Sequence, residues 1–137
     1  SYDEAESSYL SAIEKSPSNG MFYNNLAWLY IYGRHDLNTA ERFAKDAARL
    51  DPSRKYIYSD TLGVIYTYKN DFKTAEEVFK DALNAAPPED ASSLAHIYTH
   101  MIALYAKSGD EENLQKIREK LKGLSPANNT PYRIPHH

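Results

Sequence analysis

The sequence predicts an all-α protein made of antiparallel helical hairpins that stack into an α-solenoid of about seven helices. Two observations carry this prediction. Columns of small, aromatic and proline residues recur every 35 residues, a period typical of stacked two-helix repeats. Within each period, apolar residues follow at steps of three and four, the spacing of one helix face, and no alternating strand pattern occurs.

Four columns in register define the repeat. They are Ala5, Ala40 and Ala75; Tyr9, Ala44 and Phe79; Ala12, Ala47 and Ala82; and Pro17, Pro52 and Pro87. A second set lies between them, in which Leu26 and Tyr30 match Leu62 and Tyr66 at a distance of 36 residues. One copy therefore carries a single-residue insertion, which we expect to lie in a turn.

Helix breakers divide the chain. Gly33, Asn70 and Gly109 lie where a left-handed residue would end a helix. Each is followed by an aspartate whose carboxylate is suited to cap the next helix: Asp36, Asp71 and Asp110. The helices expected from these signals span about 2–15, 20–33, 37–50, 54–69, 72–85, 89–107 and 111–123.

These motifs resemble the tetratricopeptide repeat, whose pattern runs W-x2-L-G-x2-Y, then A-x3-F, then P. The copy that starts at Ser59 matches best, with Leu62, Gly63, Tyr66, Ala75, Phe79, Ala82 and Pro87. The copy that starts at Tyr23 has Ala27 and Ala44 in place of the glycine and the aromatic residue. A third copy, from about Thr99, is degenerate.

The resemblance implies a right-handed α-solenoid domain over residues 1–126. Its expected parts are a half repeat at 2–17, repeats at about 21–52, 55–87 and 91–126, and an extended C-terminal tail at 127–137. Small residues of the pattern let two helices approach closely, and the aromatic residues fill the space between repeats. Stacking then makes one continuous core.

The expected helix at 2–15 has no hairpin partner in the sequence, which leaves an apolar stripe partly uncovered. The stripe consists of Ala5, Tyr9, Ala12 and Ile13. Two explanations stay open: the chain is a fragment of a longer repeat array, or a second chain covers the stripe. At the other end, the polar outer face of residues 111–123 suits a capping helix.

The resemblance also implies a concave groove lined by the first helix of each pair. Helical spacing places one set of residues on the groove side: Asn24, Trp28 and Tyr32; Asp60, Val64 and Tyr68; and His96, His100, Ala103 and Lys107. Such a surface has aromatic walls and few charges, which favours a peptide or helical segment of a partner protein. The alternative for Trp28 is an ordinary packing position in the core.

A known use of such grooves is a clamp for a C-terminal carboxylate, which needs Lys and Asn on the first helix, Asn on the second, and Lys and Arg on the third. The matching positions hold Asn24, Trp28, Thr61, His96 and His100. None of the basic residues is present, and histidines that are largely neutral at pH 7 do not replace fixed positive charge. The clamp is therefore rejected.

His96 and His100 have the four-residue spacing of a helical metal site. No glutamate follows the first histidine and no separate ligand cluster exists, so we expect neither a metal nor a cofactor. The sequence also lacks cysteine, a glycine-rich phosphate loop and a G-x-S-x-G motif. These absences favour a protein that is not an enzyme.

Charge and hydropathy narrow the class of partner. A net charge of −3 gives no broad electrostatic basis for binding nucleic acid, and no apolar run is long enough to insert in a membrane. The leading hypothesis is a protein-interaction scaffold. The alternative is a self-assembly element that oligomerises, for instance as a homodimer, through its open N-terminal helix. The sequence does not indicate the compartment, for which cytoplasm is only the default.

Overall fold

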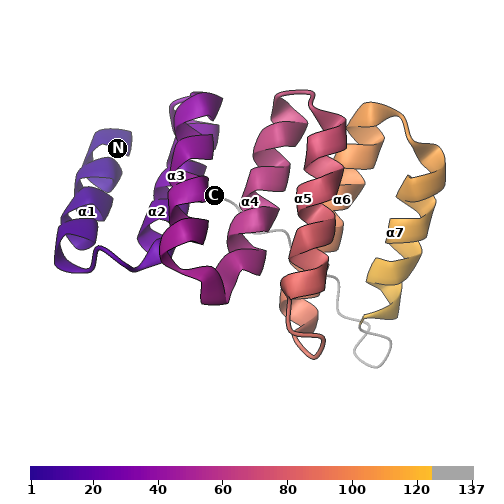
Figure 1. The fold of residues 1–137 in the computed structure, drawn as a ribbon. Helices are drawn as coiled ribbons and strands as arrows, with labels where there is room; N and C mark the ends of the chain where they lie inside the picture. Colours follow the sequence, from indigo (N-terminus) through magenta and orange to yellow (C-terminus); the bar gives the residue numbers. More distant parts are fainter. Residues whose placement is uncertain (125–137) are drawn as a thin grey trace.

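The computed structural model describes residues 1–124, which form a row of antiparallel helices (Figure 1). In this part of the chain the α-helices are α1 (Tyr2–Lys15), α2 (Gly20–Trp28), α3 (Leu37–Leu50), α4 (Lys55–Tyr68), α5 (Phe72–Ala85), α6 (Ala91–Ser108) and α7 (Glu111–Gly123). A π-helical turn, η1 (Leu29–Gly33), continues α2, and a 3-10 helix, η2 (Pro52–Arg54), precedes α4. The predicted all-α solenoid is confirmed. The tail predicted at 127–137 lies outside the described residues.

The predicted aspartate caps are confirmed. Each carboxylate accepts a hydrogen bond from the backbone amide three residues further on, at Asp36, Asp71 and Asp110. Asp90, which the sequence analysis did not single out, caps α6 in the same way through the amide of Ser93. These bonds satisfy amides that the first turn of a helix leaves without a partner. They explain why the helices begin so close to the positions expected.

The inserted residue is absorbed by the π-helical turn. Tyr30 and Asp36 are six residues apart, whereas Tyr66 and Asp71 are five apart. Even so, both aspartate amides donate to the tyrosine carbonyl oxygens, at 2.9 and 3.0 Å respectively. The wider turn of η1 takes up the extra residue, as single π turns within α-helices do.

The prediction of a left-handed backbone at Gly33 is wrong, while those at Asn70 (φ 62°) and Gly109 (φ 77°) are confirmed. Because of the π turn, the left-handed residue in the first copy is His35, with φ 56°. Gly33 is small for another reason. A Cβ atom there would lie 2.6 Å from the ring of Tyr2, so α1 packs directly on this turn.

The residues of the repeat columns pack between the two helices of each hairpin. In α3 and α5 the column residues Ala40, Ala44, Ala47, Ala75, Phe79 and Ala82 are all 0% exposed. Gly63 of α4 lies against Phe79 of α5, and this contact belongs to the core that continues into α6 and α7. The first helices also meet, since α4 contacts both α2 and α6.

Within residues 1–124, no helix is both long and apolar enough to cross a membrane.

A hydrogen bond recurs between successive hairpins. The Tyr66 hydroxyl donates to Glu41 at 2.8 Å, and the Tyr105 hydroxyl donates to Glu76 at 2.7 Å. Tyr30 makes the same bond to a third glutamate, Glu6. The three glutamates are 35 residues apart and lie on second helices. Each bond therefore ties a first helix to the second helix before it. We call this series the Tyr–Glu column.

Glu41 should make the stability of the protein depend on acid. Burial acts to raise the pKa of Glu41, but hydrogen bonds from Lys45, Lys69 and Tyr66 outweigh it and lower that pKa from 4.5 to about 2. A carboxylate whose pKa is lower in the folded state stabilises the fold above its unfolded pKa, and this contribution is lost as the pH falls. We expect urea denaturation to show stability lost between pH 4.5 and 2, and Glu41→Gln to flatten this decline.

The matched control is Glu112→Gln, because the side chain of Glu112 is 80% exposed and pairs only with Lys116 of its own helix. It should leave the acid profile as it is in the wild type. Equal slopes for Glu41→Gln and the wild type would show that Glu41 is not the group responsible.

Candidate functional site

A cavity of about 510 Å³ opens along the first helices and extends to α1. Its lining includes Tyr2, Tyr9, Met21, Asn24, Trp28, Tyr32, Tyr56, Asp60, Thr61, His96 and Ile97. We call it the groove. Its volume lies within the roughly 300–1,000 Å³ usual for ligand pockets. Five of the predicted partner-binding residues line it: Asn24, Trp28, Tyr32, Asp60 and His96.

Trp28 lies between the groove and the core. Its ring stacks on Tyr32, with centroids 5.6 Å apart and planes 9° apart, and it also meets the His100 ring at 5.9 Å. It also packs against two clusters of buried residues, one that contains Ala27 and Ile65 and one that contains Phe79 and Met101. The two interpretations of Trp28 therefore both apply. Its position is fixed by the core, while part of the ring faces the groove.

An aromatic and cationic strip continues from the groove. The edge of Tyr68 meets Tyr32 with centroids 6.1 Å apart and planes at 89°. The Lys107 ammonium lies 5.3 Å from the centre of the Tyr68 ring, within the range of a cation–π contact. Tyr32 and Tyr68 are 37% and 46% exposed. Burial raises the pKa of Tyr32, and the neighbouring Tyr68 raises it further.

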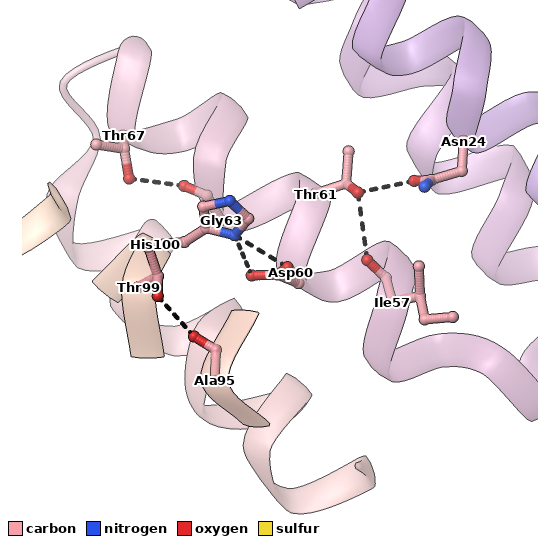
Figure 2. Close-up of polar contacts among 9 residues, drawn as sticks. All are labelled: Asn24, Ile57, Asp60, Thr61, Gly63, Thr67, Ala95, Thr99 and His100. Atoms are coloured by element: carbon pink, nitrogen blue, oxygen red, sulfur yellow. Dashed lines mark hydrogen bonds and ion pairs between the residues drawn. The ribbon is translucent and has the colours of Figure 1, made fainter. Parts of the chain in front are cut away.

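Two polar pairs join the first helices, and Figure 2 shows both of them. The Thr61 hydroxyl donates to the Asn24 side-chain oxygen at 2.7 Å, which links α4 to α2. His100 Nδ1 lies 2.8 and 3.0 Å from the two Asp60 carboxylate oxygens, which links α6 to α4. Asn24 and Asp60 are only 4% and 8% exposed. The two hydrogen-bonded pairs are suited to fix the positions of α2, α4 and α6, the helices that form the groove.

The positions of Val64 and His100 differ from the expectation. Val64 is 7% exposed and belongs to the core, because α4 is the central first helix and has neighbours on both sides. His100 was expected on the groove side, in one set with His96 and Lys107. Tyr105 and Tyr66, which make equivalent bonds in the Tyr–Glu column, are 39 residues apart, so His100 corresponds to Thr61 and faces Asp60 instead.

The histidine pair has no metal-binding geometry around it. The rings of His96 and His100 have centroids 6.2 Å apart, and the Nδ1 atom of His100 faces Asp60. Burial lowers the pKa of His96, an effect that the Asp60 charge opposes and His100 reinforces. Across residues 1–124, no three histidine, aspartate or glutamate side chains gather as ligands for one ion.

The groove contains residues that the sequence analysis assigned to packing or did not consider. They include Tyr2, Ala5 and Tyr9 of α1 and Met21, Asn25 and Leu29 of α2 and η1. The uncovered stripe on the first helix was the available signal. Helical spacing alone did not show that this stripe faces the same cavity as Trp28.

Together, the stacked hairpins, their buried cores and a groove across the first helices define an α-solenoid repeat protein. Residues 8–42 match the family model for the tetratricopeptide repeat. This match supports the resemblance to tetratricopeptide repeats that the sequence motifs indicated. The matched segment includes Asn24, Trp28 and Tyr32.

A solved structure supports the fold. The crystal structure of BtubC (BKLC) from P. vanneervenii aligns with a TM-score of 0.75 and 22% sequence identity. The alignment covers 99% of this chain and 61% of that one, so the chain spans less than two thirds of its length. At this identity the likeness concerns the fold alone. No curated protein matches the sequence.

Proposed function

We propose that the chain is a protein-interaction scaffold that binds a peptide or helical segment of a partner protein in the groove. The observation that carries this proposal is the partly exposed stack of Trp28 and Tyr32 in a cavity of about 510 Å³. Tetratricopeptide and related solenoids use their extended concave surfaces for binding. Such repeats typically serve as scaffolds and not as catalysts, and we assign the groove no reaction, metal or nucleic acid.

The groove residues divide into two roles. Trp28 and Tyr32 provide large, rigid contact area, which suits them as binding anchors. Tyr68 and Lys107 extend the surface beyond Tyr32, where the ammonium adds attraction for an acidic or carbonyl group of the partner. Asn24, Asp60 and His100 position the helices that carry these side chains, and Val64 takes no part.

A second candidate function is self-assembly through α1. Its support is the partial exposure of Ala5 and Tyr9, whose counterparts in α5 are fully buried. Sedimentation velocity over a wide concentration range separates the candidates. A stable homodimer would favour self-assembly, and a monomer that binds peptides would favour the scaffold.

The groove can be tested with peptides selected from a displayed random library on the immobilised wild-type protein. Tyr32→Ala should weaken their binding by roughly 30-fold, the loss that corresponds to truncation of an interface anchor. Trp28→Ala should abolish capture. Trp28 is the only tryptophan of the chain, so peptide binding to the wild type should also change the tryptophan emission.

Leu10→Ala is the matched control, because Leu10 is an exposed apolar residue that does not line the groove. It should bind the selected peptides like the wild type. Circular dichroism must show unchanged helicity in all three variants, since Trp28 also contacts the core. Selected peptides that bind both groove variants with wild-type affinity would refute the proposal.

A further inference from the structure

Tyr32, Tyr68 and Lys107 occupy one repeat position on three successive first helices, and we call them the strip. Each follows by two residues a tyrosine of the Tyr–Glu column, namely Tyr30, Tyr66 and Tyr105. The ring of Tyr32 meets the ring of Tyr68, and the Tyr68 ring meets the Lys107 ammonium. The strip therefore runs across the helices, in the direction in which the hairpins stack, and changes from aromatic to cationic along its length.

The exposure of the strip does not depend on an open end of the row of helices. Tyr68 lies on α4, which contacts a first helix on each side, α2 and α6. It is nevertheless 46% exposed. Tyr32 is 37% exposed, and Lys107 is exposed as well. The strip is thus a surface that neighbouring hairpins leave open at this repeat position.

The Lys107 ammonium is held in place but keeps its charge available. It lies 5.3 Å from the centre of the Tyr68 ring and donates a long hydrogen bond, 3.4 Å, to the Thr67 carbonyl oxygen. An ammonium group has three N–H donors, so the others remain available to a ligand. Within residues 1–124 Lys107 forms no ion pair, whereas Lys69, just after α4, pairs with Glu41 at 2.7 Å.

The groove itself offers no other favourable place for an acidic group. Among the described residues that line it, Asp60 is the only aspartate, glutamate, lysine or arginine. Its carboxylate is negative and faces His100. A segment that follows the groove from Trp28 along the strip therefore meets uncharged aromatic surface first and a positive charge at Lys107.

We propose that the strip recognises a partner segment in which a large apolar side chain packs on Trp28 and Tyr32 and a nearby aspartate or glutamate pairs with Lys107. The inference rests on the proposed function and names the chemistry of its ligand. The centroids of Tyr32 and Tyr68 are 6.1 Å apart, and Lys107 lies 5.3 Å beyond Tyr68. Since an extended peptide rises roughly 3.3 Å per residue, the apolar and acidic residues lie within about four positions of each other.

A side-chain carboxylate fits the strip better than other anions do. Phosphorylated motifs are generally bound by clusters of arginine, and the strip contains one lysine and no arginine. The clamp for a C-terminal carboxylate needs several basic residues, which the groove lacks. One carboxylate beside one exposed ammonium requires neither arrangement.

The test uses the peptides that the immobilised wild-type protein selects from the random library. Their sequences should be enriched in aspartate or glutamate within about four positions of a large apolar residue. In fluorescence anisotropy with fluorescein-labelled peptides, Lys107→Glu should weaken binding roughly tenfold, because a like-charge contact replaces an ion pair. Replacing the acidic residue of the peptide with lysine should restore most of this loss in the Lys107→Glu protein.

Lys73→Glu is the matched control, because Lys73 is an exposed lysine of α5 that does not line the groove. It changes the net charge equally and should bind the peptides like the wild type. Raising the ionic strength should weaken binding to the wild type more than binding to Lys107→Gln, since salt screens an exposed ion pair. Circular dichroism must show that these variants keep their helicity.

The outcomes separate this inference from the proposed function. If the selected peptides need Tyr32 but bind Lys107→Glu like the wild type, recognition of an acidic residue is overturned and the scaffold function stands. If the wild-type protein selects no peptide, both fall. An equal loss in Lys73→Glu would assign the effect to net charge and overturn the pairing with Lys107. Peptides that bind only with a free C-terminus, whatever their acidic side chains, would also overturn it.

Discussion

Replacing Gly63 with leucine should lower the free energy of unfolding by about 1–3 kcal/mol, the usual cost of overpacking a well-packed core. A Cβ atom at this position alone would lie 2.2 Å from the Phe79 ring. That ring is fully buried between α4, α5 and the following core residues, so it has no free space into which to move. Urea denaturation followed by far-ultraviolet circular dichroism measures the loss.

Gly123→Leu is the matched control, because a Cβ atom at Gly123 would meet nothing within 4 Å. Its effect should stay within about 0.5 kcal/mol, as for an ordinary surface substitution. In a Phe79→Ala background, Gly63→Leu should cost less than in the wild type, since the leucine then enters the vacated space. Wild-type stability of the Gly63→Leu protein would contradict the close approach of α4 and α5.

Asp60→Ala should also destabilise the fold, by about 1–3 kcal/mol, because it leaves a buried hydrogen-bonding group without its partner. The Asp60 and His100 side chains are only 11% and 13% exposed, so water does not readily replace the lost bond. Asp60→Asn should cost less, since the amide oxygen still accepts from the His100 ring. The His100 ring contacts Trp28, and the Asp60→Ala protein should therefore also show altered tryptophan emission.

The exposed pair of Asp46 and Arg49 provides the comparison, because Asp46→Ala should change stability by less than about 1 kcal/mol. If Asp60→Ala unfolds at the same urea concentration as the wild type, the link between α4 and α6 does not depend on this pair. If Asp60→Asn is as damaging as Asp60→Ala, the negative charge matters and the acceptor geometry does not explain the effect.

The helices could be predicted because the residues that start and end them lie within or next to each helix in the sequence. The bounds of α3 and α5 coincide with those expected from the aspartate caps and the small-residue columns. Helix α6 begins at Ala91 and not at 89, because Asp90 caps it. The π-helical turn could not be placed from spacing alone: an extra residue between Tyr30 and Asp36 fits equally well in a loop.

The groove was predicted less completely than the fold. Four-residue spacing was enough to place Trp28 and Tyr32 on its wall. The same spacing did not reveal that Val64 is buried, since burial depends on how closely α2 and α6 approach α4. The Tyr–Glu column was detectable, because Glu6, Glu41 and Glu76 share the 35-residue interval of the alanine columns. A comparison restricted to apolar residues overlooked it.

The Tyr–Glu column has a consequence for protein engineering. Each junction between hairpins presents the same two groups, a glutamate on one side and a tyrosine hydroxyl on the other, as in Glu41 with Tyr66 and Glu76 with Tyr105. The same pair of hydrogen-bonding groups is thus present at each of these junctions. A chimaera in which one hairpin is duplicated or swapped would keep compatible junctions as long as both groups are retained. The length of such an array, and with it the length of its groove, becomes a quantity that can be chosen.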